Sequence, residues 1–205
     1  MEINGKTQVL VHLAYPSAHL RTPQLFNARC RERGVDAVLV PWQVHPDNLR
    51  TVMDALRVSE SVPGAIITIP HKETVAALCD RLEGAAAVLN VANVVRKDDD
   101  GALVGRILDG EGFVGGLTRQ GRSPAGKRAL LIGAGGVSVA IADALLTAGV
   151  AALTIANRTQ EREMGGSWAG SAGWRPEWSG LASPSCWIQA RPPCRSRAFC
   201  RTTRA

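Results

Sequence analysis

Long hydrophobic runs are missing from this sequence. No stretch approaches the roughly 18 to 20 unbroken apolar residues of a membrane-spanning helix. The start, MEINGKTQVL, also lacks the basic region and apolar core of a secretory signal. We therefore expect a soluble, cytoplasmic protein. Its 205 residues, 45% of them hydrophobic, suffice for one sizeable domain or two small ones.

Paired cysteines are missing too. The five cysteines form no CxxC motif and are odd in number, so neither a zinc site nor a disulfide framework is indicated. We expect reduced thiols and no bound metal. The five are Cys30, Cys79, Cys186, Cys194 and Cys200.

An excess of basic charge is absent from most of the chain. The net charge of +6 and the isoelectric point of 9.5 would suit a nucleic-acid partner. However, residues 164–205 hold six arginines and one acid, a net charge of +5, and the other residues carry only +1. Because the body of the protein is nearly neutral, we expect neither a nucleic-acid nor a membrane partner.

Residues 164–205 also lack lysine and any sustained hydrophobic period. They hold four of the five tryptophans and three of the five cysteines, which a low-complexity disordered tail usually avoids. We favour an out-of-frame coding region as the origin of this atypical basic tail. A genuine disordered tail is the alternative.

What is present, as far as residue 159, is an alternation of apolar runs and helical patterns, typical of a parallel α/β fold. Strands are expected at residues 8–13, 35–40 and 64–69. Helices are expected at residues 22–34, 47–56 and 73–82. A hairpin with an Asp-Gly turn is expected from residues 93–96 and 102–105, followed by a helix at 110–120.

Some of these boundaries have specific signals. Thr22 fits a hydroxyl N-cap with Pro23 at the first helical position, and Gly34 fits the end of that helix. The helix at 47–56 rests on the 3.6-residue spacing of Leu49, Val52, Met53 and Leu56.

The polar segment GRSPAGK at residues 121–127 predicts a domain boundary. We expect a first domain at residues 1–122 and a second at 123–163. The second reads as one complete βαβ unit, with a strand at 129–132, a tight turn, a helix at 137–148 and a strand at 152–156.

The turn of this unit is rich in glycine. The spacing Gly133-x-Gly135-x-x-Ser138, after a strand and before a helix, is typical of a dinucleotide fingerprint. Small residues there let backbone N–H groups and the helix N-terminus approach a pyrophosphate. A plain structural turn is the alternative. The expected cofactor-binding residues are Gly133, Ala134, Gly135, Gly136 and Ser138.

The end of the next strand bears on the choice of cofactor. An acid there would bind a 2′-hydroxyl, whereas an arginine suits a 2′-phosphate. Arg158 and Arg162, beside Asn157, therefore favour NADP over NAD. Two surface arginines at a helix start are the alternative.

Lys72 and Asp109 are candidates for proton transfer. Lys72 follows a Pro-His pair after an apolar run, and Asp109 lies at a turn leading into a helix. A lysine and an aspartate that converge in a cleft can exchange protons with a hydroxyl or carbonyl substrate. The sequence alone does not bring them together, and a solvated lysine with an N-capping aspartate is the alternative.

Six ordered segments, spread over residues 8 to about 163, resemble the shikimate dehydrogenase family. They are YPSAHLRTP at 15–23, GAIITIPHKE at 64–73, VAN at 91–93, DGEGF at 109–113, GAGGVS at 133–138 and NRT at 157–159. The resemblance implies an amino-terminal α/β substrate domain followed by a Rossmann-like NADP-binding domain, which is incomplete here because the family pattern stops near residue 163. It also implies reversible NADPH-dependent reduction of 3-dehydroshikimate to shikimate, a step toward chorismate and the aromatic amino acids.

The resemblance also implies roles for single residues. Lys72 and Asp109 would form the acid/base pair, Thr68 and Asn93 would bind ring hydroxyls, and Thr22 would supply one hydroxyl of the family's serine pair. The sequence departs from the family at Leu20, in place of the first serine, and at residues 107–108, where Ile-Leu replaces Asn-Thr. Quinate or another cyclic hydroxy acid is therefore an alternative substrate.

Two further alternatives stay open. One is a catalytically inactive, truncated product that keeps only the substrate-binding domain. The other is a homodimer, in which a second copy of the chain would be a partner in addition to the small-molecule substrate.

Overall fold

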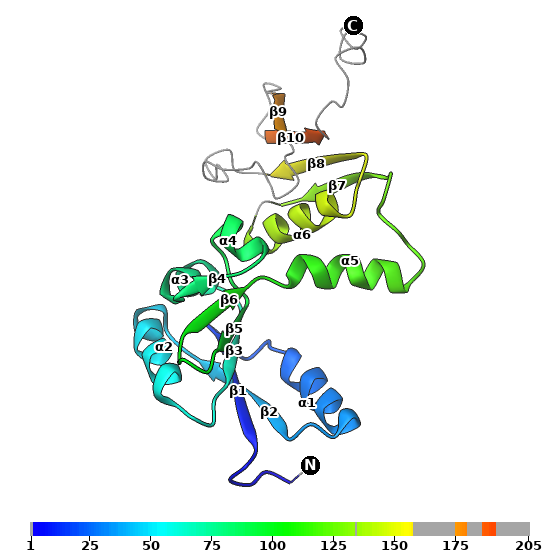
Figure 1. The fold of residues 1–205 in the computed structure, drawn as a ribbon. Coiled ribbons are helices and arrows are strands. Elements are labelled where there is room, and N and C mark those ends of the chain that lie inside the picture. The colour runs from blue at the N-terminus through cyan, green and yellow to red at the C-terminus, as the bar shows by residue number, and fades with distance from the viewer. Residues whose placement is uncertain (1, 134, 158–174, 180–185, 192–205) are drawn as a thin grey trace, which may run out of the picture. The chain divides into compact units, whose positions relative to one another are not determined.

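The computed structural model of the chain is shown in Figure 1, and it describes residues 2–133, 135–157, 175–179 and 186–191. By internal packing the chain divides into two compact units, Met1–Leu108 and Asp109–Ala205. The division by packing falls earlier than the boundary expected near residue 122, because helix α5 (Asp109–Arg119) packs against α6 (Gly136–Thr147).

The first unit contains a six-stranded sheet with the order β2-β1-β3-β5-β6-β4. Strands β2, β1 and β3 run parallel, β5 is antiparallel to both β3 and β6, and β4 is parallel to β6. The strands are β1 (Gln8–Ala14), β2 (Ala37–Gln43), β3 (Gly64–Ile67), β4 (Arg81–Leu82), β5 (Val94–Lys97) and β6 (Leu103–Arg106). The α/β class and the hairpin expected from the sequence are confirmed.

The helices of this unit are α1 (Thr22–Arg33), α2 (Leu49–Val58), α3 (Lys72–Leu78) and α4 (Ala85–Leu89), with a 3-10 turn at Pro46–Asn48. The expected spacing of α2 is confirmed, because Leu49, Met53 and Leu56 are buried against Val11 and Leu13 of β1. This cluster is the core of the unit.

Several predicted boundaries were wrong for physical reasons. The N-cap of α1 is Arg21, and Thr22 is its first helical residue, so Thr22 does not cap the helix. Gly34, in the left-handed region at φ 63°, and Val35 donate N–H bonds back to Arg31 and Cys30. This Schellman arrangement ties residue 35 to the helix end and delays β2 to residue 37.

The helix expected at 73–82 is shorter than predicted. Cys79 turns extended at the end of α3, and Asp80 donates its N–H to Leu103 O at 2.8 Å, so the chain joins the sheet as β4. The short helix α4 was not predicted.

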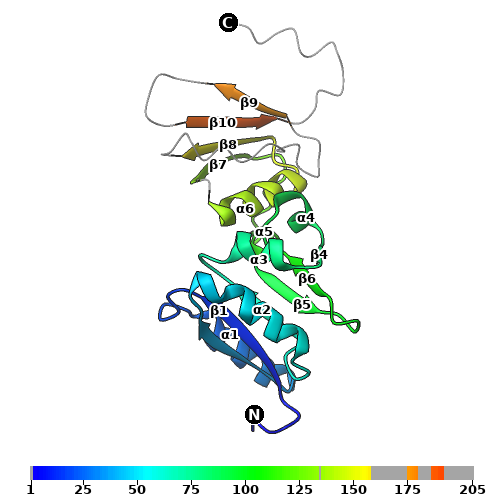
Figure 2. The ribbon, with the colours of Figure 1, turned by 90° about the vertical axis from the view of Figure 1, so that its left-hand side faces the viewer.

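The second unit contains a sheet with the order β7-β8-β10-β9, and the four strands lie side by side in Figure 2. Strands β7 (Arg128–Ile132) and β8 (Ala152–Asn157) are parallel, as a βαβ unit requires. Leu145 and Leu146 of α6 pack on Leu153 and Ile155 of β8 to form its core.

Two segments within residues 164–205 form strands that were not predicted from the sequence. Strands β9 (Arg175–Ser179) and β10 (Cys186–Arg191) pair with each other, and β10 pairs with β8; both pairings are antiparallel. Their sequences, RPEWS and CWIQAR, do not alternate strictly between hydrophobic and polar residues, so the period of a strand is absent from them. No helix in the described parts of the chain is long and apolar enough to span a bilayer.

Candidate functional site

The carboxyl ends of the parallel strands in the first unit meet at one edge of the sheet. Thr68, just after β3, donates its N–H to Leu13 O of β1 at 3.0 Å. Tyr15, just after β1, donates its N–H to Ile69 O at 3.1 Å. In open α/β sheets, ligands bind outside the carboxyl ends of the strands. This edge is therefore the candidate substrate site.

Three of the predicted site residues come together at this edge. Lys72 is the first residue of α3, Thr68 lies in the turn before it, and Asn93 directly precedes β5. Ile67 donates its N–H to Asn93 O at 2.8 Å, and Ala92 donates its N–H to Lys72 O at 3.0 Å. Since all three side chains are half-buried, they are held by the sheet yet remain open to a ligand.

Asn93 also fixes the segment that follows β6. Its backbone N–H donates to Arg106 O at 2.9 Å. Its side-chain Oδ1 accepts the N–H of Leu108 at 2.9 Å. The carboxamide therefore anchors the last residue of the first unit beside the candidate site.

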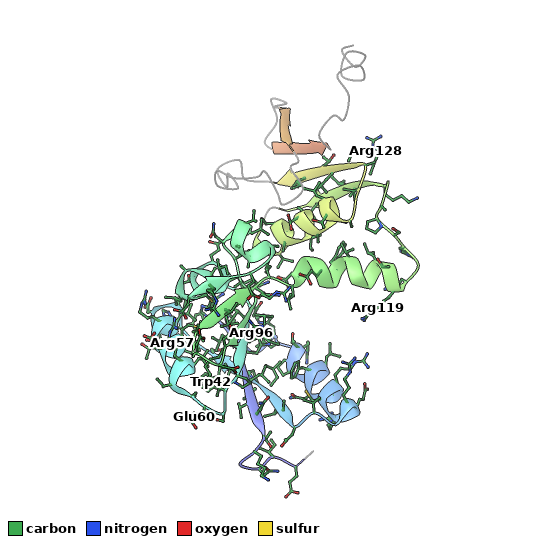
Figure 3. All side chains as sticks on the ribbon, in the orientation of Figure 1. Trp42, Arg57, Glu60, Arg96, Arg119 and Arg128 are labelled. Carbon is green, nitrogen blue, oxygen red and sulfur yellow. The ribbon has the colours of Figure 1, made fainter. Side chains whose placement is uncertain are left out.

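Both ends of α3, which carries Lys72, are held by neighbouring segments, the loop at Val44 and helix α2. At its start, Nε2 of the buried His71 lies 2.9 Å from Val44 O, and since a carbonyl only accepts, Nε2 carries the proton. Burial lowers the pKa of His71, although the bond to Val44 acts the other way. At its end, Arg57 of α2, which is labelled in Figure 3, donates Nη2–H to Leu78 O at 3.1 Å and pairs with Asp80.

A second buried histidine, His12 of β1, was not among the predicted site residues. It is 3% exposed, and its Nδ1 has no hydrogen-bond partner among the described residues. The pKa of His12 is lowered, first by burial and then by the positive charges of His19 and Lys72. The signal that could have revealed it is a single histidine within the apolar run VLVHLA.

Thr22 is not joined to this group. It is exposed at the first residue of α1. In the described part of the chain, no hydrogen bond links its side chain to Thr68, Lys72 or Asn93, so its contact with a substrate stays a prediction.

The glycine-rich turn of the second unit has the geometry of an anion site. Gly133 adopts φ +103°, a left-handed value that favours glycine, and its N–H donates to Ala156 O at 2.7 Å. Gly135 is the N-cap of α6 and Gly136 its first residue, with Ser138 in the first turn. Among the described residues, a Cβ at Gly135 or Gly136 would meet no heavy atom within 4 Å, so this helix N-terminus is a candidate phosphate site.

Four of the predicted residues lie partly or wholly outside what can be described. Ala134, Arg158 and Arg162 fall outside the described residues. Asn157 is the last residue of β8, where only its backbone pairing is described.

Asp109 is half-buried at the first residue of α5, where a carboxylate is favourable next to the positive end of the helix dipole. It belongs to the second unit and Lys72 to the first, so their pairing stays a prediction. Within the described ranges, no three His, Cys, Asp or Glu side chains are grouped so as to hold a metal ion.

The fold and these sites define an α/β protein that combines a sheet-edge site in one unit with a Rossmann-type strand, glycine turn and helix in the other. Two family models match the chain. The shikimate dehydrogenase substrate binding domain matches residues 13–95, and the shikimate/quinate 5-dehydrogenase family matches residues 117–165. The chain belongs to the shikimate dehydrogenase family.

Comparisons with individual proteins support the same family. The chain is 40% identical over 163 residues to the NADP(+) shikimate dehydrogenase of Rubrobacter xylanophilus, covering 80% of this chain and 57% of that protein. A crystal structure of shikimate 5-dehydrogenase from Listeria monocytogenes, in complex with shikimate and NAD, matches with a TM-score of 0.73 and 29% identity, covering 80% of this chain and 56% of that one.

A ligand-free 5-ketofructose reductase of Gluconobacter sp. is also similar, with a TM-score of 0.68 and 30% identity over 74% of this chain and 54% of that one. The chain spans about half the length of the curated relatives it matches. The activity of the full-length relatives is therefore a proposal for this chain.

Proposed function

We propose that this chain is built for NADP-dependent oxidoreduction of the shikimate dehydrogenase type. The reaction is the reversible reduction of 3-dehydroshikimate, or of a related cyclic hydroxy acid in its keto form, to the alcohol. The observation that carries the proposal is the convergence of Lys72, Thr68 and Asn93 at one sheet edge, with backbone bonds of 2.8 and 3.0 Å between their segments. The names of the relatives support the same chemistry.

In this proposal the chain's own residues bind the ring and manage one proton. Thr68, Asn93 and Thr22 bind ring hydroxyls. Lys72 holds a proton at the reacting oxygen and gives it up as the alcohol forms, and Asp109 shares that proton. Bound NADPH supplies the hydride.

The covalent chain supports the pairing of Lys72 with Asp109. Leu108, held by Asn93 at 2.9 Å, directly precedes Asp109. Consecutive Cα atoms are about 3.8 Å apart across a trans peptide. Asp109 is therefore the residue next to Leu108, whose backbone N–H is bonded to Asn93 of the proposed substrate site.

The nucleotide would bind the glycine turn from Gly133 to Ser138, with its pyrophosphate on the open N-terminus of α6. Arg158 and Arg162 would bind the 2′-phosphate and Asn157 the adjacent ribose edge. The open space beside Gly135 and Gly136 fits such a group.

An absorbance assay of the full chain with NADP+ and either shikimate or quinate tests the proposal. We expect NADPH to form with at least one of the two substrates. No formation with either one, at concentrations that saturate the relatives, would contradict the proposal.

A second candidate is a binding protein that keeps the substrate site but turns over nothing. One observation favours it: β10 pairs antiparallel with β8, whereas a nucleotide-binding sheet of the Rossmann type is mostly parallel. A ligand at 100 times its dissociation constant adds about 2.7 kcal/mol of stability. Thermal unfolding that shifts with shikimate but not with NADP would favour this candidate, and shifts with both would favour the enzyme.

The origin of residues 164–205 has its own test. We propose that the coding DNA near codon 163 contains a shifted frame, because the family match ends at residue 165. Sequencing that region and translating it in all three frames decides the matter. If no frame continues the family pattern, a shifted frame is not the cause.

A further inference from the structure

His12 stands out because a buried polar atom without a partner is rare in a folded protein. Buried side-chain nitrogens nearly always have a hydrogen-bond partner, so an exception calls for an explanation. His12 is 3% exposed, and its Nδ1 has no partner among the described residues. No other buried side-chain nitrogen or oxygen in the described part of the chain shares this condition.

The register of the sheet places His12 on the face that leads to the candidate site. Its neighbours Val11 and Leu13 point into the core cluster with α2 and α3, so His12 points to the opposite face. Ile66 lies opposite His12 on β3. Two residues further along the same face comes Thr68, one of the proposed substrate contacts.

The electrostatic surroundings of His12 include Lys72. Both Lys72 and His19 act on it as positive charges, and together with burial they lower its pKa. The imidazole is therefore neutral at neutral pH, with one ring nitrogen as donor and the other as acceptor. A neutral imidazole ring therefore suits a hydroxyl group as its partner better than it suits an anionic group.

We propose that His12 is a further substrate-binding residue, whose Nδ1 hydrogen-bonds a ring hydroxyl in the subsite formed by Thr68 and Lys72. This inference rests on the proposed function and adds a contact to it. Rotation of the ring about χ2, a broad torsion for histidine, can present Nδ1 to either side. The ligand class is a cyclic polyol, because such a ligand offers hydroxyls that both donate and accept.

The inference makes opposite predictions for folding and for binding. If Nδ1 is unpaired in the free protein, replacing His12 with an apolar residue should not lower stability, since an unsatisfied polar group is removed. If Nδ1 binds the ligand, the same replacement should weaken binding. A purely structural histidine would show the reverse pattern.

The experiment uses the full chain and three variants, with shikimate and quinate as probes in calorimetric titrations. His12→Leu removes both nitrogens, His12→Asn keeps a polar atom close to the position of Nδ1, and His12→Gln keeps one close to that of Nε2. We expect His12→Leu and His12→Gln to weaken binding about tenfold or more, as the loss of one hydrogen bond does. His12→Asn should stay within about threefold of wild type.

Unfolding midpoints without ligand complete the test. We expect the midpoint of His12→Leu to equal or exceed that of the wild type. Unchanged affinity in His12→Leu, or a lower midpoint with unchanged affinity, overturns the inference and leaves the proposed function intact. If the wild type binds neither probe, the proposed function fails and the inference falls with it. If His12→Leu does not fold, the comparison of His12→Asn with His12→Gln decides, and equal affinities of the two overturn the inference.

Discussion

The two units differ in how their sheets are protected. In the first unit one edge strand, β2, is partly covered by a side chain, because Asn27 of α1 bonds both the carbonyl and the N–H of Leu39, at 3.0 and 2.8 Å. Exposed edges are otherwise templates for pairing with another chain. In the second unit one of the two edge strands is β7, and two of its large apolar side chains, Leu130 and Ile132, are 59% and 80% exposed.

The side chains of β7 alternate between a covered and an uncovered face of the sheet. Leu131 packs against the core cluster of the second unit, whereas Leu130 and Ile132 point to the other face. Parallel sheets normally have both faces covered. The first unit therefore has the more completely covered sheet, and the second unit, which carries the candidate cofactor site, has the less completely covered one. The substrate site is thus expected to tolerate change better than the cofactor site.

The largest expected effect is on catalysis in the better-protected unit. Lys72→Met removes the ammonium with little change in size, and loss of a general acid lowers kcat about a hundredfold to ten-thousandfold. Stability should fall by about 0.5–3 kcal/mol, the usual range for a single substitution, because the side chain is half-buried. Steady-state kinetics and urea unfolding measure the two quantities. Lys127→Met, at an exposed lysine of the second unit, is the control. Equal losses of kcat in the two variants would show that Lys72 has no special part in catalysis.

Two glycines allow the stability of the units to be compared directly. A Cβ at Gly64 would lie 2.2 Å from Val95 O, and one at Gly110 would lie 2.1 Å from Ala140 O. Since both obstacles are backbone atoms, Gly64→Ala and Gly110→Ala should each destabilise their own unit by about 1–3 kcal/mol. Hydrogen exchange resolved by peptide reports each unit separately.

The matched control for this pair is Gly115→Ala in α5. A Cβ there meets nothing within 4 Å, and replacing a helical glycine with alanine stabilises by about 0.5–1 kcal/mol. If Gly110→Ala is as harmless as Gly115→Ala, the close packing of α5 on α6 is not present in solution.

We also expect the stability of the two units to respond differently to acid. Burial lowers the pKa values of His12 and His71 below 6.5, so the unfolded chain binds more protons than the folded one in that range. Stability is then retained above pH 6.5 and lost as pH falls through that value, by up to about 1.4 kcal/mol per pH unit for each group. The second unit has no histidine, so its exchange protection should not follow this dependence.

His71→Gln tests the assignment, since its amide can still donate to Val44 O but does not titrate in this range. We expect a flatter stability profile between about pH 5 and 7. An unchanged slope in His71→Gln would mean that another group carries the acid sensitivity.

The sequence predicted the two regions unequally. The α/β class, the hairpin and the spacing of α2 followed from local patterns, and two family-like segments, residues 64–73 and 91–93, identified three residues that the sheet brings together. His12 was overlooked although it stands alone within the apolar run VLVHLA, because its unpartnered Nδ1 becomes visible only once the strands are paired. Strands β9 and β10 were missed because their sequences do not alternate strictly between hydrophobic and polar residues. The cap of α1 was misplaced by one residue, which is the usual uncertainty at a helix end.

The smallest expected effect on stability comes from the uncovered face of β7, yet it tests the comparison most directly. Leu130→Lys and Ile132→Lys place charges on side chains that are 59% and 80% exposed. Because little apolar burial is lost, each should change the free energy of unfolding by less than about 0.5 kcal/mol. The charge should also reduce self-association through this face and edge, as measured by light scattering over a range of protein concentrations.

Leu131→Lys supplies the contrast within the same strand. Its side chain packs against the core of the second unit, so an uncompensated charge there should destabilise that unit by several kcal/mol. If Leu130→Lys and Ile132→Lys are as damaging as Leu131→Lys, both faces of β7 are covered in solution. In that case the second unit is protected as fully as the first, and the reason for its expected weakness is removed.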